Sequence, residues 1–101
     1  MRTRQQLQSK LEELLGSRNV YYQPPESVKM EYPAIRYSKS NIKSTFANDA
    51  KYSKIKCYEI IVISKKQDEL LLDKIHDLPY CSFDRSYKYE NLYHDVFTLY
   101  Y

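Results

Sequence analysis

The chain has 101 residues, of which 43% are hydrophobic and 29% charged, so its composition is that of a folded globular protein rather than a disordered one. Its net charge of +3, from 16 basic and 13 acidic residues without a polybasic tract, permits contact with nucleic acid but does not argue for it. No apolar run approaches the ~20 residues of a membrane-spanning helix, and the polar N-terminus lacks the apolar core of a signal peptide. We therefore expect no membrane contact and a protein that stays in the cytoplasm until it is assembled.

The first predicted element is an amphipathic helix over about residues 3–15. Gly16 is expected to end it, because glycine is the usual residue just past a helix C-terminus. Four leucines recur at i, i+4, i+7 and i+8 and form one apolar stripe: Leu7, Leu11, Leu14 and Leu15.

A proline-rich segment, residues 19–37, is predicted to connect this helix to a sheet. It contains two short strands, at 20–22 and 34–38. The first strand must end before Pro24, because proline cannot donate a hydrogen bond to a neighbouring strand.

The polar and basic stretch 39–51 carries no secondary-structure signal, and we expect a long protruding loop there. Loops of this length are uncommon in compact domains and are usually functional or disordered. Ile42 and Phe46 stand alone among polar residues. With Lys43 and Lys51 they are the candidate contacts of an arm that becomes ordered against a neighbouring subunit.

Residues 52–64 give the strongest strand signal, since they are rich in β-branched and aromatic side chains. The end of this strand is apolar on both faces, which predicts a central strand covered by a helix on one side. A second helix is expected within 65–78, and the spacing of Ser64 and Gln67 suggests a capping box at its start.

The remaining residues predict a hairpin that turns near Glu90. Its register places Arg85 opposite Asp95, and we take these two residues as a structural cross-strand pair of opposite charge. The same register makes three further pairs: Cys81 with Leu99, Phe83 with Phe97, and Tyr87 with Tyr93.

The element order is therefore α-β-β-long loop-β-α-β-β. It predicts the α+β class, with a single antiparallel-rich sheet and two helices packed on one of its faces. At this length we expect one domain over residues 1–101, with the loop at about 39–51 protruding from it.

No constellation of residues argues for an enzyme. The four cysteines and histidines are separated by 18, 4 and 12 residues, whereas zinc sites use close pairs. A single glycine excludes a glycine-rich phosphate loop. We expect no catalytic, metal-binding or cofactor-binding residue among the candidates for such sites: Cys57, His76, Cys81 and His94.

Nucleic-acid binding is a better alternative to assembly. Lysines in and after the long loop alternate with aromatic residues, as on surfaces that combine phosphate contacts with base stacking. A solvated loop and a strand edge protected by lysines explain the same pattern. The residues concerned are Lys39, Lys43, Lys51, Lys54, Lys56, Phe46, Tyr52 and Tyr58.

Tyrosine dominates the aromatic residues, with 12 Tyr against 3 Phe and no Trp, and tyrosine suits half-buried sheet faces and protein interfaces. Three segments, "VYYQPPESVKMEYPAIRY", "NIKSTFANDAKY" and "LPYCSFDRSYKYENLYHDVFTLYY", carry a resemblance that covers nearly the whole chain. The chain resembles the small tail-terminator or tail-completion proteins encoded in the structural gene clusters of long-tailed phages and prophages of Gram-positive bacteria.

The resemblance implies a virion protein of the tail or neck, assembled in the cytoplasm of the host bacterium. It implies a hexameric ring of this chain that caps the tail tube, stops its elongation and provides the docking surface for the head connector. The implied partners are further copies of the chain, the tail tube protein and the connector or neck protein. DNA would pass through the lumen without sequence-specific binding. A head–tail joining protein, either stopper or adaptor, is the nearest alternative, and a small basic nucleic-acid-binding module is the second.

Overall fold

The computed structural model describes residues 3–24, 29–47 and 50–100, with side chains over 3–24, 29–39 and 57–100. Two helices and five strands make up this part of the chain, which confirms the α+β class and the predicted order of helices and strands, apart from the long loop. In chain order the elements are α1 (Arg4–Leu15), β1 (Val20–Tyr22), β2 (Ala34–Ala47), β3 (Ala50–Ser64), α2 (Glu69–His76), β4 (Cys81–Tyr89) and β5 (Leu92–Tyr100).

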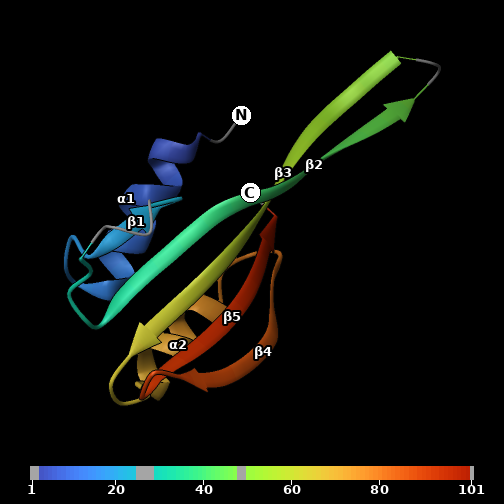
Figure 1. Ribbon diagram of the computed structural model, residues 1–101. Coiled ribbons are helices and arrows are strands. Elements are labelled where there is room, and N and C mark those ends of the chain that lie inside the picture. Colours follow the sequence, from blue (N-terminus) through green and yellow to red (C-terminus); the bar gives the residue numbers. More distant parts are fainter. Residues whose placement is uncertain (1–2, 25–28, 48–49, 101) are drawn as a thin grey trace.

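The strands form one sheet in the order β1-β2-β3-β5-β4 (Figure 1). Only β1 and β2 run parallel, and the other neighbours are antiparallel, so the sheet is antiparallel-rich as expected. β3 lies in the middle of this order, as its apolar sequence predicts.

The ends of the helices follow from local capping. Thr3 and Gln6 form a capping box at the start of α1, and Gly16 ends the helix with a left-handed φ of 80°. The predicted capping box of Ser64 and Gln67 is wrong. Ser64 is the last residue of β3, and the side chain of Asp68 caps α2 instead, by accepting hydrogen bonds from two backbone N–H groups.

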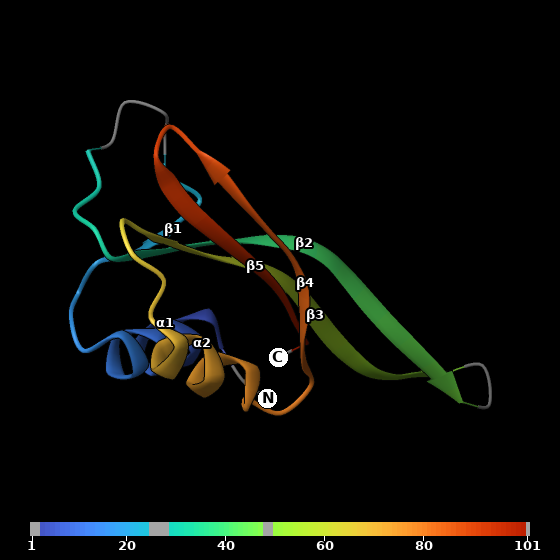
Figure 2. The same cartoon turned by 90° about the horizontal axis from the view of Figure 1, so that it is seen from below.

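The core lies between the helices and the sheet, and Figure 2 shows α1 and α2 next to each other on the same side of it. Leucines of α1 and Leu71 and Ile75 of α2 meet alternate residues of the strands in one apolar cluster. The fully buried strand residues of this cluster include Ile35, Tyr37, Tyr58, Ile60 and Leu99.

The predicted loop at 39–51 is wrong, because β2 continues to Ala47 and β3 begins at Ala50. The two strands pair from Lys39 opposite Tyr58 to Ala47 opposite Ala50, with irregularities after Lys39 and after Thr45. The sequence does not predict these strands, because residues 39–56 are polar at most positions and so lack the apolar alternation of a half-buried strand.

The predicted pair of Arg85 with Asp95 is also wrong. Glu90 and Asn91 both have positive φ, as in a two-residue type I′ turn, and this turn places Tyr89 opposite Leu92. Arg85 is therefore opposite Val96, and Asp95 is opposite Ser86.

The other three predicted pairs of the β4–β5 hairpin lie on either side of one irregularity in its register, and their outcomes differ. A register shift between Phe83 and Arg85 restores the predicted pairing further from the turn, so the pairs of Phe83 with Phe97 and of Cys81 with Leu99 are confirmed. The predicted pair of Tyr87 with Tyr93 is wrong, since Tyr87 lies opposite His94.

Candidate interaction surfaces

The most prominent feature of the molecule is a long two-stranded ribbon, which we call the projecting hairpin and define as residues 39–56. β1 pairs with β2 only as far as Tyr37, and β5 pairs with β3 only from Cys57 onward. Between these points the hairpin extends past the end of the sheet (Figures 1 and 2). It makes the molecule elongated, with extents of 51 × 27 × 23 Å.

All four candidate contacts of the predicted arm belong to this hairpin. Their backbone register places Ile42 opposite Lys56 and Phe46 opposite Lys51. Lys43 lies opposite Ile55, and the side chains of these positions are outside the described part of the structure. The structure therefore brings the four residues onto one ribbon, although it places them in strands rather than in a loop.

The projecting hairpin concentrates the positive charge of the protein. It contains five of the 16 basic residues and one of the 13 acidic residues. The remaining residues therefore carry eleven basic and twelve acidic side chains, a slight negative excess. The hairpin is therefore basic, whereas the rest of the chain is close to neutral.

A second surface lies on the face of the sheet opposite the helices, and we call it the aromatic face. On this face, residues that lie opposite one another on neighbouring strands form rows across the sheet. One row consists of Arg36 on β2, Ile61 on β3, Val96 on β5 and Arg85 on β4. A hollow of about 540 Å³ opens on this face, lined mainly by apolar and aromatic side chains. Tyr87 and Tyr89 remain 41% and 61% exposed.

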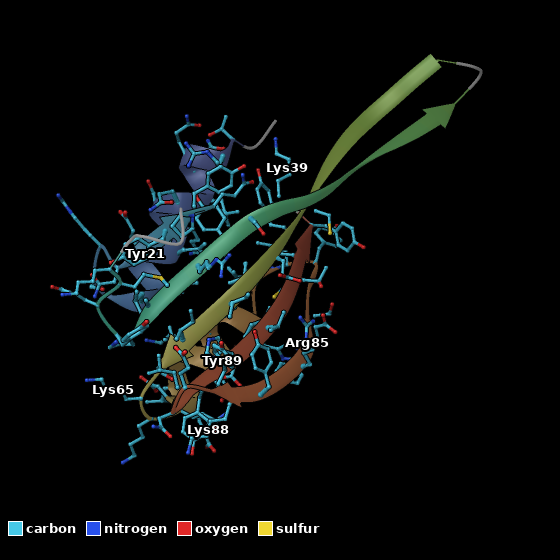
Figure 3. All side chains as sticks on the ribbon, viewed as in Figure 1. Tyr21, Lys39, Lys65, Arg85, Lys88 and Tyr89 are labelled. Atoms are coloured by element: carbon cyan, nitrogen blue, oxygen red, sulfur yellow. The ribbon has the colours of Figure 1, made fainter. Side chains whose placement is uncertain are left out.

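Contacts between neighbouring rings hold this surface in place. The rings of Tyr87 and His94 are stacked with centroids 4.8 Å apart, and Tyr89 meets His94 edge to face at 6.3 Å. The guanidinium carbon of Arg85 lies 5.9 Å from the centre of the Tyr87 ring. Figure 3 shows Arg85 and Tyr89 along β4. Exposed aromatic rings that are already ordered are typical of the anchors of protein interfaces.

The sequence did not reveal the aromatic face. Its tyrosines were visible, but the register error near Glu90 paired Tyr87 with Tyr93 instead of His94. The Glu90-Asn91 pair was the available signal, because asparagine favours the left-handed conformation that a two-residue turn requires. In the same way, Asn48-Asp49 is a turn-compatible pair that was the signal for the projecting hairpin.

The candidate catalytic and metal-binding residues are distributed over the fold. His76 belongs to α2, Cys57 to β3, Cys81 to β4 and His94 to β5. Over the described residues, no group of three or more histidine, cysteine, aspartate or glutamate side chains is placed to hold a metal ion. His94 instead stacks on Tyr87, and its Nδ1 lies 3.0 Å from the carbonyl oxygen of Leu92.

The thiol of Cys81 gives a prediction about stability. Burial raises its pKa from 9.0 to about 11, so the folded chain keeps the thiol protonated at pH values where the unfolded chain ionises it. The stability that this contributes is full below pH 9 and is lost as the pH rises to about 11. We expect the free energy of unfolding of Cys81→Ala to fall less steeply over this range than that of the parent. Urea unfolding at a series of pH values measures both slopes, and equal slopes would contradict the assignment.

Comparisons with known protein families and with curated proteins found no match to this chain. Neither described helix is long and apolar enough to cross a membrane. The projecting hairpin and the aromatic face therefore have to be interpreted from their own geometry and charge.

Proposed function

We propose that the chain is a ring-forming structural protein that caps the tail tube of a long-tailed phage or prophage. The observation that carries the proposal is the projecting hairpin, which the backbone extends well past the sheet. A two-stranded ribbon alone is only marginally stable in water. A ribbon of this length is most readily explained if it contacts another subunit in the assembled particle.

Ring formation requires two different surfaces on each subunit, because a ring closes through a head-to-tail interface. The projecting hairpin, which is basic and thin, supplies one of them, and the slightly acidic body supplies the other. The aromatic face then remains for a different partner. We assign it to the tail tube protein or to the head connector, since ordered tyrosines are suited to such contacts.

The particular assembly comes from the sequence resemblance to tail-terminator proteins. It supplies the hexameric copy number, the position at the end of the tube and the role in stopping elongation. The partners are then further copies of this chain, the tube protein and the neck protein, in a virion assembled in the bacterial cytoplasm. DNA passes through the lumen without sequence-specific binding.

Two other roles compete with this proposal. A joining protein of the neck would use the same surfaces, with the ring lying between the head connector and the tail. A nucleic-acid-binding module is favoured by the five lysines of the hairpin, and it predicts binding to DNA that weakens steeply with salt concentration.

Electron microscopy of particles made without this chain tests the proposal. Tails that are overlong and detached from filled heads are expected, because elongation has lost its stop. Tails of normal length without heads would place the chain at the head–tail joint instead. Intact infectious particles would overturn both roles, and the salt dependence of DNA binding would then be measured.

A further inference from the structure

A small hollow lies between α2, the edge strand β4 and its neighbour β5, on the opposite side of the sheet from the aromatic face. Its volume is about 300 Å³. Leu72, Phe83 and Phe97 form its apolar walls, and Phe83 meets Phe97 edge to face with ring centroids 5.5 Å apart. Walls of this kind suit the methylene stem of a long side chain.

The hollow is also lined by Asp95, an acidic residue that is unusual because it is buried. Only 2% of this residue is exposed, yet it is an acidic side chain. Its Oδ1 accepts hydrogen bonds from Ser86 Oγ at 2.7 Å and from Gln67 Nε2 at 3.1 Å. Its Oδ2 is buried and has no hydrogen-bond partner among the described groups. Buried carboxylates in proteins are normally paired with a cation, because an unpaired one loses its hydration without compensation.

The surroundings of Asp95 do not supply that cation. Asp73 and His76 of α2 also line the hollow, and none of the lysines and arginines with described side chains does. Arg85, the predicted partner of Asp95, instead forms an ion pair with Asp84, with 2.7 Å between Nη1 and Oδ2. The hollow therefore contains two carboxylates with no lysine or arginine to balance them, and its charge favours a cationic ligand.

We propose that this hollow receives the ammonium group of a lysine from the projecting hairpin of a second copy of the chain. The stem of the lysine packs between Leu72 and Phe83, and its ammonium donates to Asp95 Oδ2 and to Asp73 at the rim. Gln67 and Ser86 keep their hydrogen bonds to Oδ1, so that Oδ2 is the oxygen left for the ammonium group. This assignment rests on the proposed self-assembly and names the surface that the hairpin contacts.

The charge distribution indicates that the lysine comes from the hairpin of a second copy of the chain. The projecting hairpin has five lysines and one acidic residue, whereas the rest of the chain has a slight acidic excess. In Figure 1 the hairpin of the same molecule points away from α2, so it cannot fill its own hollow. A hairpin from a neighbour, however, is free to approach the outer side of α2 and β4.

Zero-length carbodiimide coupling of a mixture of unlabelled and ¹⁵N-labelled protein tests the contact. It joins a carboxylate to an amine only where the two touch. We expect peptides that link Asp73 or Asp95 to a lysine of residues 39–56, with one partner labelled and the other not. Links from the hairpin only to other carboxylates, or links only within one molecule, would overturn the proposal.

A matched pair of variants provides the second readout. Asp73 and Asp77 are both exposed on or next to α2, but only Asp73 lines the hollow. Asp73→Lys is expected to weaken self-association about tenfold, measured by analytical ultracentrifugation, whereas Asp77→Lys changes it less than about twofold. Equal effects would overturn the assignment of the hollow while leaving self-assembly intact. Failure of the parent protein to self-associate at any concentration would count against the proposed function itself.

Discussion

Replacing residues 42–56 with Asn-Gly is expected to abolish self-association while the body of the protein remains folded. Asn41 and Cys57 are paired in the sheet, so a two-residue turn between them closes β2 and β3 where the hairpin leaves the body. Every described strand partner of residues 42–56 also lies within 42–56, so the replacement removes no pairing with β1 or β5. The free energy of unfolding should therefore change by less than about 1 kcal/mol.

A shorter replacement separates contact from general disturbance of the sheet. Thr45 and Ser53 are also paired, and joining them by Asn-Gly removes only the tip of the hairpin. We expect weakened rather than abolished self-association from this variant. Cross-linking and ultracentrifugation measure association, and urea unfolding measures stability. Unchanged assembly by the longer replacement would contradict the role of the hairpin as a subunit-contact arm.

Phe97→Ala is expected to lower the free energy of unfolding by about 3–5 kcal/mol, the usual cost of removing a buried aromatic ring. Phe97 is 2% exposed and lies opposite Ile60 on the central strand. Domains of this size are stable by only about 5–15 kcal/mol, so the variant should unfold at a much lower urea concentration.

The neighbour of Phe97 on β4 offers the matched control. Phe83 is directly opposite Phe97 but is 50% exposed, so its ring contributes much less burial. We expect Phe83→Ala to cost less than half as much as Phe97→Ala. Equal losses of stability would mean that the core extends to the outer edge of β4, contrary to the burial pattern of that strand.

The elements that bury apolar residues were predictable from the sequence. The leucine stripe of α1 and the apolar end of β3 have the periodicities of a helix on a core and of a central strand, and the structure places them so. The projecting hairpin could not be predicted this way. Its strands pair with each other past the end of the sheet, and their mostly polar sequence lacks the apolar alternation that reveals a strand.

The predicted pair of Arg85 with Asp95 was wrong for a different reason. The register of a hairpin depends on the length of its turn and on any β-bulge, and both must be known to predict the pairs between β4 and β5. With a three-residue turn assumed and no bulge, the opposite charges of Arg85 and Asp95 suggested an attractive but incorrect pair. The correct register separates these two residues and leaves Asp95 Oδ2 without a partner among the described groups. This oxygen is the proposed acceptor for the lysine of a second copy.

The proposed ring can be tested by cryo-electron microscopy of the upper end of the tail in particles that carry this chain. We expect a closed ring of six copies at the end of the tail tube, with the hairpin of each copy lying across its neighbour. A density in which the hairpins touch no other copy, or in which the chain lies elsewhere than at the end of the tail tube, would contradict the proposal.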